Sequence, residues 1–220
     1  MQIHTEKNQK ESKQHGNFEF PVHVSQESIR SYEQGSFLWH WHREIELTWF
    51  QSGQIEYYVN DKKYILKEGE GLFCNSNALH SGYMVDHQDC HYISVTFSPR
   101  FIYGYENSLL QTKFVDFITS NESWHSLKLS PDTGWQQDIR DIQRIYELSL
   151  EPSADYELEL HILLAGIWQR LYRYYASLPE TEHHSQKHLK RLREILTYLQ
   201  EHCRQEISLD DVAAHVNICK

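Results

Sequence analysis

The spacing of apolar residues changes once along this chain, near residue 132, and this change limits the folds open to it. Before it, short runs rich in aromatic and branched residues, each bounded by turn residues, predict strands at 38–49, 55–59, 64–66, 71–74 and 91–97. Strands this close together, with no helix between them, favour an antiparallel sandwich or barrel. We therefore expect an α+β protein whose antiparallel β-barrel, residues 18–131, precedes a helical part.

Two turns support the β-rich half. Ser52-Gly53 and Asn60-Asp61 separate predicted strands, and Gly and Asn tolerate the positive φ that tight hairpin turns require. We predict a hairpin turn at each of them.

After residue 132 the apolar residues recur at helical spacing. Ile139, Ile142 and Ile145 share one face of a first helix that Pro152 ends. A second helix, 156–175, has one apolar face made by Leu160, Leu163, Leu164, Ile167, Leu171 and Tyr175, and another made by Ile162, Trp168 and Tyr172. A helix with two apolar faces needs two partners. We expect residues 132–180 to pack on the barrel and to form a homodimer, with one thick core in a single subunit as the alternative.

Composition and charge exclude several classes of protein. A net charge of −10 opposes whole-surface binding to nucleic acid. No apolar run approaches a membrane span, and the polar start resembles no signal peptide, so we expect a cytoplasmic protein with no membrane partner. Residues 1–17 hold one large apolar side chain, Ile3, and predict a disordered tail. The cysteines show no CxxC spacing and should stay reduced; they are Cys74, Cys90, Cys203 and Cys219.

Three histidines and a glutamate form the candidate site. His40 and His42 are two residues apart, so on a strand both rings project from one face with Cα atoms about 6.6 Å apart. Glu46 has the same parity, and His80 follows a turn-rich segment. Three imidazoles and a carboxylate suit a divalent metal such as zinc, iron, manganese or nickel.

Other interpretations of these four residues remain open. They could face solvent as ordinary polar residues, or face the barrel interior as hydrogen-bonding groups of a ligand pocket, because an unpaired buried imidazole or carboxylate is costly. Glu44 and Thr48 share the parity of Glu46 and are further ligand-binding candidates. Trp39 and Tyr92 could stack on a sugar or another small organic ligand, although aromatic rings also fill small barrels.

The spacing of these residues resembles a known motif. His40, His42, Glu46 and Gly53 follow the pattern His-x-His-x3-Glu-x6-Gly, which is similar to the first motif of the cupin β-barrel. Residues 69–80 look like its second motif, with Ser76 where proline is usual. The resemblance implies a cupin-like barrel with these side chains at its centre.

The last segment resembles a second family. Residues 189–219 are similar to the first helix and the opening of the helix-turn-helix in AraC/XylS-type transcription regulators, with Ser-Leu-x-x-Val-Ala at 208–213. Ser208 should cap a short helix over 209–216. The resemblance implies that residues 186–220 start a DNA-binding domain and stop before its first recognition helix. We expect no DNA-binding residue in this chain, and DNA contact only through a missing C-terminal part.

Together these resemblances imply the effector-sensing and dimerisation portion of an AraC-type regulator, not an enzyme, with a small metabolite such as a sugar in the barrel. One alternative is a metal-dependent cupin enzyme, a dioxygenase or isomerase, that uses His40, His42, Glu46 and His80. Another is a dimerising module with an empty barrel.

Overall fold

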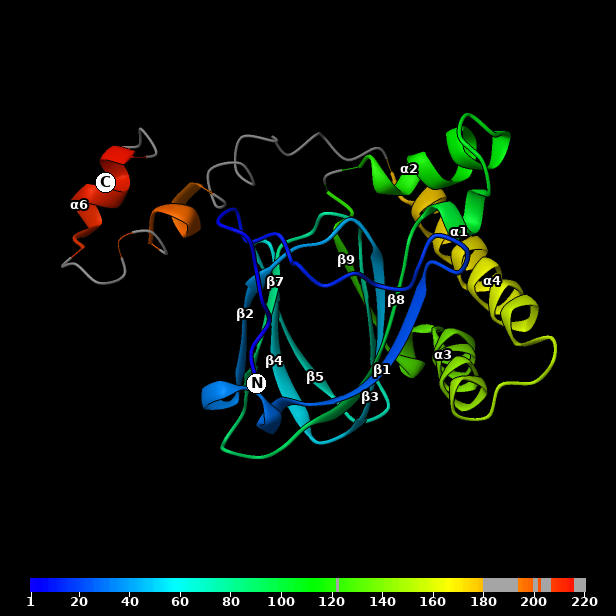
Figure 1. Ribbon diagram of the computed structural model, residues 1–220, viewed down its shortest axis with the longest axis horizontal. Helices are drawn as coiled ribbons and strands as arrows, with labels where there is room; N and C mark the ends of the chain where they lie inside the picture. Colours follow the sequence, from blue (N-terminus) through cyan, green and yellow to red (C-terminus); the bar gives the residue numbers. More distant parts are fainter. Residues whose placement is uncertain (122, 180–193, 200–201, 203–206, 216–220) are drawn as a thin grey trace.

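The computed structural model describes residues 1–121, 123–179, 194–199, 202 and 207–215. Its strands form two antiparallel sheets, ordered β1-β8-β3-β6-β9 and β2-β7-β4-β5, which face each other as the walls of a barrel (Figure 1). The strands are β1 Val22–Ser28, β2 Ser36–His40, β3 Ile45–Ser52, β4 Gln54–Val59, β5 Lys62–Lys67, β6 Gly71–Cys74, β7 His80–Met84, β8 His91–Phe97 and β9 Ser126–Leu129.

Two long helices, α3 and α4, cover the outer face of the five-stranded sheet (Figure 1). The α-helices are α1 Arg100–Tyr103, α2 Asp116–Thr119, α3 Gln136–Leu150, α4 Tyr156–Ser177 and α6 Leu209–His215. Short helical turns are η1 Ile29–Ser31, η2 Glu33–Gly35, the π-helical η3 Gln111–Val115 and η4 Pro131–Thr133. The predicted α+β architecture is confirmed, and α3 and α4 lie where the helical spacing predicted them.

Alternation along β3 shows how the sheet separates two environments. Ile45 and Leu47 belong to the core that includes α3 and α4. Phe50 belongs to the second core, inside the barrel, and Glu46 and Thr48 share its parity and are buried. Both faces of β3 are therefore covered, one by helices and one by the barrel interior.

The second face of α4 is less exposed than the sequence predicted. Trp168 is only 3% exposed and belongs to the core, and Tyr172 packs against the rings of Phe114 and Phe117. The large hydrophobic residues that α4 leaves exposed are Leu158 and Ile162, at 62% and 61%. The apolar stripe available to a partner is thus narrow.

Three strand predictions need correction. The run 38–49 is not one strand, because β2 ends at His40 and β3 begins at Ile45 in the other sheet. Gly53 has the predicted positive φ of 74°, but its turn joins the two sheets instead of closing a hairpin. Asn60, with φ 51°, does lie in the turn of the β4–β5 hairpin. Residues 100–119, expected within a β-only region, carry α1, η3 and α2.

Residues 1–17 differ from the expected tail. Backbone bonds join the segment to the link between β2 and β3: Glu11 N–H donates to the Trp41 carbonyl at 2.9 Å, and Trp41 N–H donates to the Gln9 carbonyl at 3.0 Å. The Trp41 indole N–H donates to the Asn8 carbonyl at 2.8 Å. Backbone and polar contacts, together with Ile3 packed against the core inside the barrel, therefore hold the segment in place.

The C-terminal predictions fall partly outside the described residues. Most of the first helix of residues 186–220 lies there, although residues 194–199 are helical. In α6, Asp211 N–H donates to Ser208 Oγ at 3.2 Å, while Ser208 N–H donates to the Asp211 carboxylate at 2.9 Å. This reciprocal pair confirms Ser208 as the N-cap. In the part of the chain that the structure describes, we find no helix both long and apolar enough to cross a membrane.

Candidate functional site

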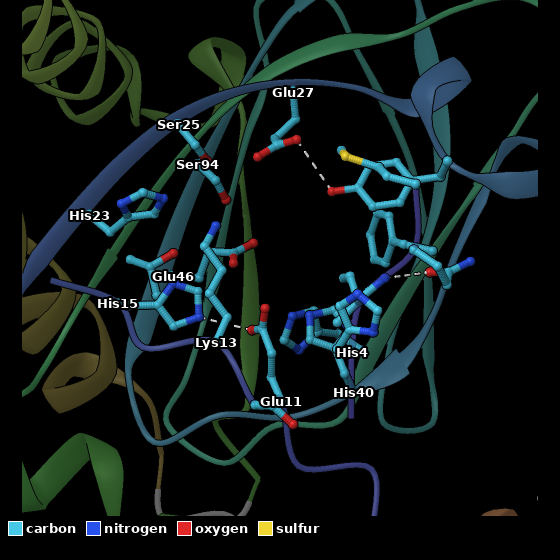
Figure 2. Close-up of a pocket in the computed structure, with 18 of the residues that line it drawn as sticks. His4, Glu11, Lys13, His15, His23, Ser25, Glu27, His40, Glu46 and Ser94 are labelled. Atoms are coloured by element: carbon cyan, nitrogen blue, oxygen red, sulfur yellow. Dashed lines mark hydrogen bonds and ion pairs between the residues drawn. The ribbon is translucent and has the colours of Figure 1, made fainter. Parts of the chain in front are cut away.

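A cavity of about 470 Å³ lies inside the barrel, within the range typical of small-molecule sites. One part of its wall is aromatic, with Tyr32, Phe37, Tyr57 and Tyr92. Met1 and Ile3 add an apolar edge. Most of the other lining residues are polar and come from the N-terminal segment and from the inward positions of β1, β3 and β8: Glu11, Ser12, Lys13, His15, His23, Ser25, Glu27, Glu46, Ser94 and Thr96. Figure 2 shows Glu27, Glu46, Glu11 and His40 placed around this space.

The three predicted histidines come together beside the cavity. His40 at the end of β2 pairs in register with His80 at the start of β7, and their ring centroids are 4.1 Å apart. His42 follows the end of β2, and its ring lies 5.1 Å from that of His80. All three are buried, and one donor atom from each lies within 4.8 Å of the others. The predicted convergence is present, although a bend after His40, not strand parity, brings His42 in.

Backbone carbonyls orient all three imidazoles. Because a carbonyl oxygen only accepts, each Nδ1 donates: His40 to Leu38 and His80 to Ala78 at 2.9 Å, and His42 to Glu44 at 3.2 Å. Every Nε2 then carries a free lone pair in the neutral ring. The Nε2 atoms of His42 and His80 are buried without a hydrogen-bond partner. The cluster therefore presents unused acceptor nitrogens to its own centre.

Glu46 completes the cluster as its acidic member. Its Oε1 accepts hydrogen bonds from Thr48 Oγ1 at 3.1 Å and from the Tyr57 hydroxyl at 3.2 Å. Its Oε2 lies 3.6 Å from His42 Nε2, an ion-pair distance rather than a hydrogen bond. Thr48 and Tyr57 thus fix the carboxylate so that its second oxygen faces the histidines.

The charges of the cluster differ from residue to residue. Burial, with repulsion from His80 and His42, lowers the pKa of His40 well below its usual value, and burial lowers the pKa of His80. Burial acts the same way on His42, but the attraction of Glu46 outweighs it and raises the pKa of His42. Burial alone would raise the pKa of Glu46, yet the imidazoles, His42 first, hold it well below its usual value. The site is an ionised carboxylate beside imidazoles of which His40 and His80 are neutral.

These residues fit a divalent metal. Metal-bound histidines usually donate the other ring nitrogen to a carbonyl or carboxylate, as all three do here. Zinc–nitrogen bonds of about 2.0–2.1 Å place tetrahedral donors about 3.3 Å apart. One donor atom from each of the three imidazoles lies within 4.8 Å of the other two, so the rings already face a common point. His40, His42 and His80 could hold such an ion as three protein ligands, which leaves a fourth position for Glu46 or for a ligand in the cavity.

The other predicted ligand residues are distributed unevenly. Tyr92 lines the cavity, whereas Thr48 lies behind the lining and positions Glu46. The structure does not bring Trp39 or Glu44 to the cavity. Trp39 packs against the ring of Tyr58 at 5.9 Å, and the Glu44 carboxylate lies on the Nδ1 side of His42 at 3.7 Å.

Several cavity residues were missed by the sequence interpretation. His23, Ser25 and Glu27 alternate with outward residues along β1, and Ser94 and Thr96 do so along β8. This polar alternation is visible in the sequence and could have revealed them. Glu11, Lys13 and His15 come from the segment taken as a tail, and no periodicity marks them.

Comparison with known proteins finds a relative in sequence and two structures of similar fold. The uncharacterized HTH-type transcriptional regulator YdeC of Bacillus subtilis (strain 168) is 28% identical over 211 residues, covering 94% of this chain and 70% of that protein. ToxT of Vibrio cholerae O395, bound to (E)-4-(8-methylnaphthalen-1-yl)but-3-enoic acid, aligns with a TM-score of 0.51 at 12% identity, over 91% of this chain and 73% of ToxT. Another ToxT structure, at 1.65 Å resolution, has a TM-score of 0.50 at 11% identity, over 91% and 72%.

The family match covers most of the barrel and of its helices. Residues 28–166 match the family model of the AraC-like ligand binding domain. The match includes all four residues of the histidine–glutamate cluster and spans more than half of the chain. The chain therefore belongs to the family of AraC-like ligand-binding domains, as the sequence resemblance implied.

Proposed function

We propose that this chain is the sensing part of a transcription regulator and that its barrel binds a small polyhydroxylated molecule, such as a sugar. The observation that carries this proposal is the cavity of about 470 Å³ with an aromatic side and a polar side. Aromatic rings suit the apolar face of such a ligand. Carboxylates and imidazole nitrogens accept hydrogen bonds from its hydroxyl groups.

The charges of the lining support a hydroxylated ligand over a fatty acid. Three carboxylates, Glu11, Glu27 and Glu46, line the cavity, against a single lysine, Lys13, among the described lining residues. A ligand carboxylate would meet these acidic groups, and a long hydrocarbon tail would leave Ser25, Ser94 and Thr96 without partners. The butenoic acid bound in the ToxT complex therefore gives no guide to the effector of this chain.

A divalent ion held by His40, His42, His80 and Glu46 is part of the proposed site. When bound, it would supply a Lewis-acidic position for a hydroxyl oxygen of the effector. The Nε2 atoms of His42 and His80, buried and unpartnered, support this assignment. The same four residues would serve the rival enzyme function, but the family match is to a ligand-binding domain of regulators, which favours sensing.

A thermal-shift screen against sugars and polyols tests the effector. A ligand at 100 times its Kd is expected to add about 2.7 kcal/mol to the free energy of unfolding. Glu46→Gln should abolish this shift, because the amide replaces the ionised acceptor that faces the cavity. Glu44→Gln, outside the cavity lining, should preserve it.

The same screen can contradict the proposal. If long-chain acids stabilise the protein and no polyol does, the hydroxylated effector is wrong. If chelator-treated protein binds the effector with unchanged affinity, the ion is not part of the site.

We further propose that α4 mediates a homodimer through Leu158 and Ile162, which lie one helical turn apart and are both exposed. Replacing Ile162 with glutamate should place a charge in that interface and shift the protein to monomer, as measured by sedimentation. Leu109→Glu is the matched control, because Leu109 is 69% exposed but lies outside α4. A dimer that survives I162E and dissociates with L109E would move the interface to the residues after α1.

The partners follow from this assignment. A regulator acts on DNA, so the proposal places the chain in the cytoplasm and gives DNA contact to residues beyond the sensing barrel. YdeC, an HTH-type regulator by name, supports this arrangement.

A further inference from the structure

A second cluster of metal-ligating side chains joins the N-terminal segment to the barrel. The segment, residues 1–17, runs across one end of the barrel (Figure 1). Backbone bonds between Gln9, Glu11 and Trp41 fix it there and bring Glu11 and His15 next to His42. In Figure 2, Glu11 and His15 lie side by side at the cavity.

The geometry of this cluster suits an ion. His15 Nε2 lies 2.9 Å from Glu11 Oε2, and the rings of His15 and His42 are 5.1 Å apart. One donor atom from each of the three residues lies within 4.8 Å of the others. The Glu11 and His15 side chains are 8% and 6% exposed, although Glu11 and His15 belong to a segment with few apolar contacts.

Unused ring nitrogens point to a ligand in this cluster. His15 Nδ1 and His42 Nε2 are both buried and have no hydrogen-bond partner. Burying an imidazole nitrogen without a partner is costly, and a metal ion would satisfy a nitrogen that no protein group reaches. The negatively charged Glu11 carboxylate lies beside His15, so we expect the ligand to be a cation rather than an anion.

We propose that Glu11, His15 and His42 form a second divalent-cation position, which takes Zn²⁺ or a similar transition metal and fastens the N-terminal segment to the barrel. Two imidazoles and one carboxylate are a common zinc donor set that leaves one coordination position for water. The assignment does not depend on the ion proposed at His40, His42, His80 and Glu46, because only His42 is common to both sets.

Sharing His42 has a direct consequence. Its Nδ1 is occupied by the Glu44 carbonyl, so a single nitrogen, Nε2, serves both positions. The inner position, made by His40, His42, His80 and Glu46, and the outer position, made by Glu11, His15 and His42, therefore compete for one imidazole. An ion in the outer position links the N-terminal segment to His42. An ion in the inner position takes His42 Nε2, and Glu11 and His15 then keep only the contact between themselves.

The test separates the two positions by mutation. The double variant His40→Ala/His80→Ala removes the inner set and should still bind one equivalent of Zn²⁺. With Zn²⁺ at ten times its Kd, amide hydrogen exchange within residues 5–15 of this variant should slow about tenfold, because protection scales with 1 + [Zn²⁺]/Kd. Adding His15→Ala should abolish both effects, whereas adding His4→Ala, in the same segment but outside the cluster, should change neither.

Single variants of the otherwise unchanged chain keep the test decisive if the double variant does not fold. Zn²⁺ should protect the segment in His80→Ala, which removes a ligand of the inner set only, and not in His15→Ala or Glu11→Gln. If His15→Ala binds Zn²⁺ as wild type does and exchange in the segment never responds, the outer position is wrong and the inner one stands. If His15→Ala loses all Zn²⁺ binding while Glu46→Gln keeps it, the outer position stands and the inner one is wrong.

Discussion

Replacing Gly53 with alanine is expected to lower the free energy of unfolding by about 3 kcal/mol. Gly53 has φ 74°, where a Cβ atom is disfavoured by about 1–2 kcal/mol. A Cβ built there would lie 2.1 Å from the Asp89 carbonyl oxygen, so the backbone must also move. The strands that meet at this turn belong to different sheets, so the displacement would disturb the closure of the barrel.

Gly69→Ala is the control for that variant, measured by urea unfolding. Gly69 has φ 82°, but a Cβ there meets no heavy atom within 4 Å. Its loss should be limited to the backbone term of about 1–2 kcal/mol. Equal losses in the two variants would show that the contact with Asp89 carries no cost.

Trp168→Ala is expected to cost about 3–5 kcal/mol, the range for removing a buried large aromatic residue. Trp168 is 3% exposed, and its ring packs 6.3 Å from that of Phe73 on β6. Its indole N–H donates to the Phe114 carbonyl at 3.3 Å, so the variant also leaves a backbone acceptor without that partner. The cavity left behind would separate α4 from the sheet that it covers.

Gln169→Ala, at the next position on α4, is the matched control because Gln169 is exposed. Its effect should stay within about 0.5 kcal/mol. Chemical denaturation at several protein concentrations would measure both variants apart from any change in dimerisation. A loss below about 1 kcal/mol for Trp168→Ala would mean that α4 docks mainly through other residues.

The sequence predicted those parts of the fold that have a regular period. Ile139, Ile142 and Ile145 marked α3, and Leu160, Leu164 and Leu171 marked the buried face of α4, because an amphipathic helix must repeat its apolar residues. The members of the histidine cluster were also predictable, because the spacing of His40, His42 and Glu46 matched a known motif, although strand parity is not what brings His42 into the site. Family resemblance added the regulator class, which the comparisons confirm.

The remaining features depend on contacts between distant segments. The bend at 41–44 moves His42 into the site while transferring the chain to the other sheet, and no local pattern encodes that transfer. Glu11 and His15 are buried because backbone bonds to Trp41 hold them there, which low apolar content alone does not suggest. For Trp168, helical spacing could not distinguish a face that meets the sheet and η3 from one that meets a second subunit.

Strand β3 separates the interior of the barrel from the core formed with α3 and α4. Glu46 faces the histidines, while its neighbours Ile45 and Leu47 touch the helical layer. A movement of the strand that adjusts the carboxylate to a guest inside the barrel must shift the apolar side chains on the opposite face by a similar amount, because both are carried by the same backbone. Substitutions inside the barrel that move β3 will therefore also change the packing of α3 and α4. Substitutions in these helices will in turn shift the side chains that face the cavity.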